Sequence, residues 1–440
     1  MAHFGIFCPP GKGHIHTMLS IVRRLPRDQH RFTYFQLPDL EEYVTSVCPG
    51  IEFRRIGSSK FPVGAMKQSW QPISQLSGRA ALGFSVQRFI PYAEVFLQEG
   101  CDAVQEAKVD ILLVDQLEVY GSSIAERLSI PFITIASALP LNAESGVPPC
   151  ITGWTYSRNP LAKVRNIAGH RYFSEVTAPA RKLVNDFRVR WGLRPLPLEW
   201  SKREEFYSQL AQISQLPQCL DFPRRKLPEN FYPTGLLMDE SIRGDIPFPW
   251  ERLDGKPLIY ACLGTEMNEQ AHVFSAIAEA CSGLNAQLVI SLGRGRLSEA
   301  ALGPLPGNPV VVDYAPQDQL LRRTSLLITH GSLNTTLEAV GYGVPMVIIP
   351  FAYDQPGVAS RIAWHGAGEA LPLKKLSTTR LRKKITRVLN EPRYREKAQH
   401  FKSELGVRKG VELACEIVEH VLVRQGVFGK KLVCAGASGG

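Results

Sequence analysis

A histidine in a glycine-rich loop is the first residue of this chain suited to acid–base chemistry. His14 ends the sequence Gly11-Lys12-Gly13-His14, which follows the apolar run 4–8. With an unperturbed pKa of about 6.5, a histidine here is well matched to taking a proton from a hydroxyl near neutral pH. Such a loop can also hold a phosphate, although the complete dinucleotide and P-loop patterns are absent. His14 and His16 lack a third metal ligand, so we expect no metal site.

A carboxylate that could orient His14 ends another apolar run. Asp115 directly follows Ile111 to Val114. The carboxyl ends of neighbouring parallel strands meet at one edge of a sheet, so Asp115 and His14 can approach one another there. A carboxylate in contact would stabilise the imidazolium that forms when His14 accepts a proton. The alternative is that Asp115 caps a helix that starts near Val119.

The stretch 314–355 carries the sharpest pattern. The strand predicted over 326–329 runs into small and polar residues and then a helix, whose free N–H groups and dipole would attract an anion. His330, Gly331, Ser332, Asn334 and Thr335 suit a diphosphate, Glu338 suits a ribose diol, and Asp354 with Gln355 suits the vicinal hydroxyls of a sugar. In Tyr314-Ala315-Pro316-Gln317, the tyrosine could stack on a flat base.

The elements that position these residues alternate between strands and helices. Apolar runs predict strands over 4–8, 111–114, 131–135, 258–262, 288–291, 310–312, 326–329 and 346–349. Such alternation predicts right-handed crossovers and parallel sheets, with ligands outside the carboxyl ends of the strands. The 440 residues predict two domains, 1–225 and 226–410, with a proline-rich linker within 216–256. We expect a helix over 411–426 that crosses back to the first domain, and a disordered tail over 427–440.

Composition narrows the class of protein. The net charge is +10, and basic residues gather in 374–402, but no DNA or RNA motif is present, so no nucleic-acid partner is expected. A loose attraction to anionic membrane surfaces would suit a lipid-like acceptor. There is no signal peptide and no apolar run of about 18 residues, which predicts a cytoplasmic protein. The nine cysteines form no CxxC pair, as is typical of reduced thiols.

Taken together, the motifs resemble those of the family-one UDP-dependent glycosyltransferases of the GT-B fold, over nearly the whole chain. The resemblance implies an α/β protein with two Rossmann-like doubly wound parallel-sheet domains that face across a cleft. It implies that Tyr314 stacks on uracil, Gln317 helps to hold the base and Glu338 binds ribose. It implies that the diphosphate is held by His330, Ser332, Asn334 and Thr335, with Ala315 and Gly331 in the same donor-binding set. Asp354 and Gln355 would hold the sugar, and Gly264-Thr265 resembles the family's loop beside the phosphates. Gly13-His14-Ile15-His16-Thr17 resembles the family's Gly-His-x-Asn-Pro, with His14 as base and Asp115 as its partner.

Three departures refine this resemblance. Tyr314 replaces a frequent tryptophan, Leu333 stands where plant members have tryptophan, and His16-Thr17 replaces Asn-Pro. The first two indicate a bacterial-type member similar to macrolide, sterol or carotenoid glycosyltransferases. The implied reaction is an inverting, metal-independent transfer, since no DxD motif occurs.

The implied substrates are a UDP-sugar and a small hydrophobic acceptor. Gln355 after Asp354 favours UDP-glucose by resemblance. Acceptors that fit are terpenoids, carotenoids, sterols, polyphenols and macrolides. Six aromatic residues of the first domain are candidates for the acceptor pocket or for its core: Phe84, Phe89, Tyr92, Phe96, Trp154 and Tyr156. The alternatives are a UDP-sugar epimerase, a lipid-linked GlcNAc transferase, or an inactive scaffold on the same fold.

Overall fold

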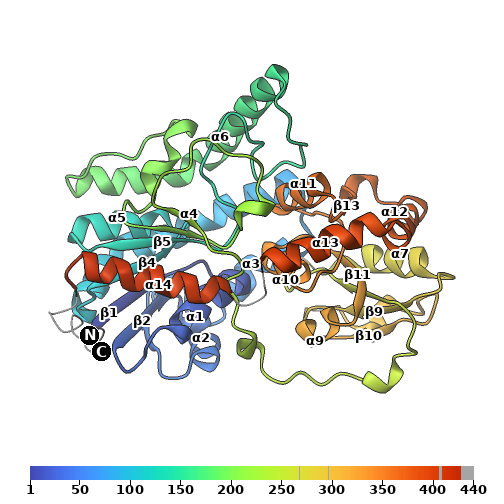
Figure 1. Cartoon of the computed structure of the whole chain (residues 1–440). Coiled ribbons are helices and arrows are strands. Elements are labelled where there is room, and N and C mark those ends of the chain that lie inside the picture. The colour runs from blue at the N-terminus through green and yellow to red at the C-terminus, as the bar shows by residue number, and fades with distance from the viewer. Residues whose placement is uncertain (267, 296, 406–408, 428–440) are drawn as a thin grey trace, which may run out of the picture.

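The computed structural model describes residues 1–266, 268–295, 297–405 and 409–427. Two lobes, each with a parallel sheet between helices, lie side by side (Figure 1). The central strands of both sheets are buried on both faces, which explains why most of them are short continuous apolar runs. The two parallel sheets predicted from the sequence are therefore present.

The first lobe contains a seven-stranded sheet with the order β3-β2-β1-β4-β5-β6-β7. Its strands are β1 Ala2–Phe7, β2 His30–Gln36, β3 Glu52–Arg55, β4 Ile111–Asp115, β5 Phe132–Ala136, β6 Gln212–Ser214 and β7 Phe231–Pro233. β4 pairs with β1 on one side and with β5 on the other, with Phe7 opposite Val114 and Asp115 opposite Ile135. The carboxyl ends of these three strands therefore meet at one edge.

The second lobe contains a six-stranded sheet with the order β10-β9-β8-β11-β12-β13. Its strands are β8 Leu258–Cys262, β9 Gln287–Ser291, β10 Val310–Val312, β11 Thr324–Thr329, β12 Met346–Ile348 and β13 Gly368–Ala370. β11 is central, between β8 and β12. The loops that follow β8, β11 and β12 therefore lie next to one another.

Helices cover both faces of each sheet. In the first lobe they are α1 Lys12–Arg24, α2 Glu41–Val47, α3 Ala65–Trp70, α4 Gly78–Ala107, α5 Val119–Leu128 and α6 Pro160–Arg190. Those that follow are α7 Ala271–Cys281, α8 Glu299–Leu302, α9 Gln317–Leu321, α10 Leu333–Gly341, α11 Gln355–His365, α12 Thr378–Asn390, α13 Pro392–Leu405 and α14 Lys409–Arg424. Short 3-10 turns are η1 Pro38–Leu40, η2 Gln71–Gln75, η3 Trp200–Phe206, η4 Gln218–Leu220, η5 Glu240–Arg243, η6 Trp250–Arg252 and η7 Leu373–Lys375.

The last helix belongs by packing to the first lobe. α14 lies across that lobe beside α1 (Figure 1). Ala414, Val418 and Leu422 share one hydrophobic cluster with Met18 and Val22 of α1. The chain therefore passes between the lobes twice, once after β7 and once before α14.

The passage after β7 starts later than the sequence suggested. The first sheet continues to Pro233, past the predicted domain boundary at residue 225, because β7 pairs with β6 in parallel. Of the predicted tail, residues 428–440 lie outside the described residues.

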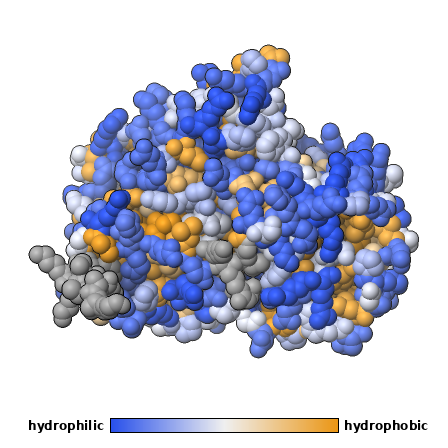
Figure 2. All heavy atoms as spheres, viewed as in Figure 1, coloured by the Kyte–Doolittle hydropathy of each residue, from blue (hydrophilic) through white to orange (hydrophobic). Residues whose placement is uncertain are grey.

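The surface offers no extended apolar face in the view of Figure 2, where hydrophobic residues form small separate patches. Among the described residues, no helix combines the length and the apolar character that crossing a membrane requires.

Candidate active site

Three side chains of the first lobe converge where β1, β4 and β5 end. His14 lies in the first turn of α1, directly after the β1 loop, and Asp115 is the last residue of β4. Ser137 follows β5. The β1-β4-β5 strand order brings the three together although 123 residues separate His14 from Ser137.

The three side chains form one hydrogen-bonded group. Nδ1 of His14 lies 2.9 Å from Oδ2 of Asp115 and 2.6 Å from Oγ of Ser137. The Ser137 hydroxyl also donates to Oδ2 of Asp115. The other Asp115 oxygen accepts from the Leu117 amide at 3.0 Å, and α5 begins after Glu118, so Asp115 is not its cap. In the neutral form of His14, the single proton lies on Nδ1 toward Asp115, and the Nε2 lone pair is then left for a substrate.

Burial and charge act in opposite directions on His14. Its side chain is 23% exposed, whereas that of Asp115 is fully buried. Burial lowers the pKa of His14, but the charge and hydrogen bond of Asp115, together with the carboxylates of Glu266 and Asp354, raise it to about 9. His14 is therefore a stronger base than a free imidazole, and it carries a proton at neutral pH in the ligand-free protein.

An anion site is built where β11 runs into α10 in the second lobe. Ser332 precedes the helix, whose first N–H groups point outward, and the 8%-exposed Thr335 lies in its first turn. His330 sits beside them, and burial lowers its pKa to about 4, so its ring is neutral. Gly331 has φ +89°, and a Cβ there would lie 2.6 Å from Ile348. Glycine therefore lets the loop pass close to β12.

A second glycine lets the loop after β8 approach His330. Gly264 has φ +79°, and a Cβ on it would lie 2.7 Å from Cε1 of the His330 ring. Thr265 follows it. The predicted phosphate-side residues Gly264, Thr265, His330, Ser332 and Thr335 thus come from neighbouring strand ends.

Glu338, the carboxylate predicted to bind ribose, already forms an ion pair with an arginine. Glu338 is 3% exposed and accepts two hydrogen bonds from Arg243 of η5, at 2.8 and 2.5 Å. It also accepts a 2.7 Å hydrogen bond from Gln317. Gln317 was predicted to lie near the base, and it is only one helix turn from Tyr314 in sequence. In the structure, however, its side chain bonds Glu338. No local pattern pointed to Arg243, which lies in the proline-rich connection between the lobes.

Tyr314, the residue predicted to stack on the base, also has an arginine over its ring. The Arg294 guanidinium lies 4.5 Å from the centre of the Tyr314 ring. Ala315, next to it, is buried. Across the lobe boundary, Lys12 lies 5.3 Å from the Tyr43 ring, and the phenol of Tyr43 bonds His16 at 2.5 Å. This part of the site is therefore rich in cations and aromatic rings.

The remaining predicted residues connect the lobes or brace a loop. The Asn334 amide donates to the Gly13 carbonyl at 3.1 Å and accepts from Gln215 at 2.6 Å. Asp354 accepts from the Leu139 amide at 2.9 Å, and burial raises its pKa. Gln355 accepts from the amides of Phe351 and Ala352 at 2.8 and 3.0 Å, so its oxygen braces its own loop.

Ser137 was missed from the sequence, although a signal for it existed. It follows the predicted strand over 131–135 as a small polar residue, the position that contributed Asp115 one strand earlier. Of the six aromatic candidates for an acceptor pocket, Tyr92 and Phe96 lie in the core of the first lobe. Tyr156 stacks on Phe222 at 5.5 Å.

Comparison with known proteins identifies the family and the fold. The family model described as UDP-glucoronosyl and UDP-glucosyl transferase matches residues 93–426. The zeaxanthin glucosyltransferase of Pantoea ananas is 30% identical over 425 residues, which cover 96% of each chain. That of Pseudescherichia vulneris is also 30% identical, over 96% of this chain and 98% of its own. The calicheamicin glycosyltransferase CalG4 is 21% identical, with a TM-score of 0.70 over 97% of this chain and 99% of its own.

Proposed function

The chain belongs to the UDP-glucoronosyl and UDP-glucosyl transferase family and has the GT-B fold, and from this premise we propose that it transfers glucose from UDP-glucose to a hydroxyl of a small hydrophobic acceptor. The observation that supports the proposal most strongly is the pair of His14 Nδ1 and Asp115 Oδ2, which lie 2.9 Å apart. The residue before His14 is Gly13, whose carbonyl accepts a hydrogen bond from Asn334 of the second lobe. A base of the first lobe thus stands next to the site of the second.

In the proposed reaction His14 acts as general base. Its neutral Nε2 takes the proton of the acceptor hydroxyl while the oxygen attacks the anomeric carbon of glucose and the bond to UDP breaks. Asp115 then faces an imidazolium and stabilises it, and Ser137 helps fix the carboxylate. Attack opposite the leaving group inverts the configuration, so an α-linked donor yields a β-glycoside.

The second lobe would stabilise the departing UDP. Negative charge that develops on the diphosphate meets the N-terminus of α10, with Ser332, Asn334 and Thr335 as further donors. The neutral ring of His330 can donate one hydrogen bond there. These groups supply the electrostatic stabilisation that a bound metal supplies in other transferases, so we propose that transfer needs no metal.

Donor binding would exchange protein contacts for ligand contacts. Glu338 would release Arg243 to accept the ribose hydroxyls, and Arg294 would leave the face of Tyr314 to the uracil. Asp354 and Gln355 would bind the glucose hydroxyls.

For the acceptor we propose a hydroxylated carotenoid or related terpenoid. The support is the likeness to two zeaxanthin glucosyltransferases over nearly the whole chain. A long apolar acceptor would be held near membranes, and the net charge of +10 would favour loose contact with anionic surfaces.

The test is incubation of the purified protein with UDP-glucose, UDP-galactose or UDP-GlcNAc and a panel of acceptors, with and without EDTA. Mass spectrometry detects glycosides, and NMR of the anomeric proton gives the configuration. We expect β-glucosides of zeaxanthin that form equally in EDTA. Conversion of the UDP-sugar without acceptor would indicate an epimerase instead. An α-glycoside would contradict inversion, and lack of any conversion would favour a scaffold role.

A further inference from the structure

The N-terminal half of α6 projects from the top of the first lobe, beyond the other helices (Figure 1). At the end of this projection, hydrophobic and hydrophilic residues lie next to one another (Figure 2). Two large hydrophobic side chains of its first turns face solvent, Leu161 with 76% of its surface exposed and Val164 with 65%. Among the described residues, no other two exposed large hydrophobic residues lie within one helix turn of each other. Exposed apolar side chains that gather in one place mark a contact surface.

The sequence explains why this half of α6 has one buried face and one exposed face. Asn159 caps the helix by accepting a hydrogen bond from the Leu161 amide at 2.8 Å, and Pro160 begins it. The face that packs on the first lobe consists of buried residues: Ala162, Asn166, Gly169, His170 and Phe173. The opposite face carries exposed residues that recur every three or four positions: Leu161, Val164, Ala168 and Arg171. The exposure of the two apolar side chains thus follows from the register of the helix, and the core of the lobe does not need them.

The charges on this segment are all positive. Residues 145–174 contain no aspartate or glutamate but four basic residues: Arg158, Lys163, Arg165 and Arg171. All but Arg165 are exposed, and these three form no ion pair within the described chain. Arg79 of α4 adds a further cation, 5.0 Å from the centre of the Tyr172 ring of α6. The first acidic residue of α6 is Glu175, about three turns beyond Val164. Basic side chains with free charge therefore surround the two apolar ones.

We propose that the tip of α6, which consists of Leu161 and Val164 with Arg158, Lys163 and Arg171, docks the protein on an anionic lipid bilayer. The basic side chains would contact the lipid headgroups, and the two apolar side chains would enter the boundary between headgroups and acyl chains. Within the described chain no helix can cross a bilayer, so this contact would be made at its surface.

The shape of the tip favours a bilayer over a protein partner. A stable protein interface buries about 800 Å² on each side. The end of a projecting helix is convex and narrow, and it presents only two large apolar side chains. A bilayer is soft and continuous, so a narrow tip can enter it without a matching groove. Its anionic headgroups also complement a surface that carries cations and no acids.

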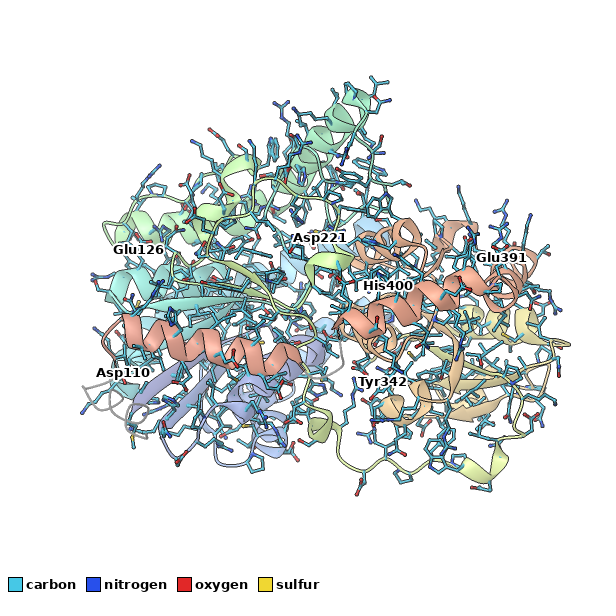
Figure 3. The ribbon with its side chains drawn as sticks, viewed as in Figure 1. Asp110, Glu126, Asp221, Tyr342, Glu391 and His400 are labelled. Atoms are coloured by element: carbon cyan, nitrogen blue, oxygen red, sulfur yellow. The ribbon has the colours of Figure 1, made fainter. Side chains whose placement is uncertain are left out.

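The tip is joined to the proposed transfer site through α11. In the loop that leads into α6, Gly153 lies so close to α11 that a Cβ on it would be 3.7 Å from the Pro356 carbonyl. Asp221, which lies between the two lobes (Figure 3), bonds Arg361 of the same helix at 2.8 Å. α11 begins at Gln355, the residue proposed to bind glucose. A bilayer at the tip would therefore suit an acceptor dissolved in lipid, and in this respect docking rests on the proposed function.

Flotation of the full chain with lipid vesicles tests the docking surface. The probes are vesicles of phosphatidylcholine alone and of phosphatidylcholine mixed with phosphatidylglycerol. We expect binding to the mixed vesicles only, with an affinity that falls as salt is added. The triple variant Arg158→Gln, Lys163→Gln and Arg171→Gln should bind them at least about tenfold more weakly, since each basic residue near an anionic surface contributes roughly fivefold. If this variant bound as the wild type does, the tip would not face the membrane.

A second triple variant controls for net charge. Lys383→Gln, Arg395→Gln and Lys402→Gln remove the same charge from exposed positions of α12 and α13 in the second lobe. Its binding to the mixed vesicles should stay close to that of the wild type. Equal losses in the two triple variants would show that the net charge of +10 attracts the protein without any docking surface, and would overturn the proposal.

The apolar part of the tip is tested by Leu161→Ser combined with Val164→Ser. This variant should bind the mixed vesicles roughly tenfold more weakly, because apolar side chains that enter the bilayer add to the electrostatic attraction. The matched control is Leu413→Ser with Val423→Ser on α14, where the two side chains are 42% and 59% exposed. Both variants should unfold at the wild-type temperature, since exposed side chains contribute little to stability. Undiminished binding of the α6 variant, or its unfolding at a lower temperature, would contradict a free docking surface.

Transfer to an acceptor in the bilayer separates docking from catalysis. With zeaxanthin in mixed vesicles at limiting lipid, the α6 triple variant should form glucoside more slowly than the wild type, in proportion to its lost binding. With a water-soluble nitrophenol the two proteins should react alike. Flotation requires neither UDP-glucose nor an acceptor, so a failure of the proposed transferase reaction would leave the docking surface testable. Equal rates with zeaxanthin in vesicles would overturn docking and leave the transferase reaction standing.

Discussion

The side-chain amide of Asn334 in the second lobe donates a hydrogen bond to the carbonyl of Gly13 in the first, at 3.1 Å. Gly13 directly precedes His14, and Asn334 lies in the first turn of α10. A single contact thus joins the proposed diphosphate site to the loop that carries the proposed base. The contact therefore brings together residues that are far apart in sequence and that we propose to act on one donor and one acceptor.

Removal of the proposed base should abolish most of the transfer to alcohols. His14→Ala leaves no group at this position to accept the proton, and general base catalysis typically contributes about 10²- to 10⁴-fold. We expect kcat to fall by that factor while KM for UDP-glucose changes little. The measurement is steady-state kinetics with an aliphatic alcohol acceptor.

A nitrophenol acceptor provides the control for His14→Ala. Its hydroxyl ionises near neutral pH and needs little help from a base, so the variant should retain much more of its rate. Equal losses with the alcohol and the phenol would show that His14 acts in binding or folding and not as a base.

The pH dependence follows from the pKa of His14, which Asp115 raises to about 9. Only neutral His14 accepts a proton, so below pH 9 the active fraction falls tenfold for each pH unit. kcat/KM should therefore rise with pH, reach half of its maximum near pH 9 and level off above that. In Asp115→Asn the charge that raises the pKa of His14 is gone. The rise of kcat/KM should therefore occur at lower pH, and its plateau value should be lower. If kcat/KM rose over the same pH range in that variant, a group other than His14 would cause the pH dependence.

Asp354 should matter for the sugar and not for the nucleotide. Asp354→Ala removes the carboxylate proposed to bind glucose hydroxyls, and a lost hydrogen bond to a charged group is worth about 1.5–3 kcal/mol. kcat/KM for UDP-glucose should fall roughly 10- to 100-fold, while the inhibition constant of UDP stays the same. A parallel loss of UDP affinity would show instead that the Leu139–Asp354 contact organises the whole site.

The ion pair of Arg243 and Glu338 predicts that UDP stabilises Arg243→Met against unfolding more than it stabilises the wild type. Arg243→Met leaves Glu338 buried beside Gln317 alone, and breaking a buried pair typically costs about 3–5 kcal/mol. The variant should unfold at a lower temperature. UDP should restore more stability to the variant than it adds to the wild type, because ribose hydroxyls then donate to a carboxylate that has lost its cationic partner. A smaller effect of UDP would mean that Arg243 itself holds the nucleotide.

Much of the second lobe could be predicted from the sequence because the patterns that indicate its strands and helices lie within short segments. Strand, turn and helix follow one another from Leu326 to Glu338, and the structure places the N-terminus of α10 as predicted. Each of the central strands is buried on both faces, so the apolar runs that predict them are continuous. Five strands were missed from the sequence: β2, β3, β6, β7 and β13. β3 and β13 are partly exposed and mixed in polarity. β2 is largely buried, but polar residues interrupt its apolar run, and β6 and β7 are only three residues long.

What was not legible depends on contacts between distant segments. Arg243 and Arg294 lie in loops, and nothing nearby in sequence indicates that they meet Glu338 and Tyr314. Ser137 becomes significant only once β5 is known to lie beside β4. The sequence could not separate core from pocket residues either, since a buried aromatic residue such as Phe96 has the same sequence pattern whether it packs in a core or lines a pocket.

Gly264 offers a test of how closely the loop after β8 must approach His330. Gly264→Ala combines a strained φ of +79° with a Cβ 2.7 Å from the His330 ring, so the ring must move away from the proposed diphosphate site. Gly283 is the matched control, because its φ is +77° but a Cβ there meets nothing within 4 Å. Both alanine variants should lose about 1 kcal/mol or more of stability through backbone strain, measured by urea unfolding. Only Gly264→Ala should weaken UDP binding and lower kcat, since only its side chain displaces His330. If the two variants lost UDP affinity equally, backbone strain alone would explain the effect and His330 would have no part in holding the diphosphate.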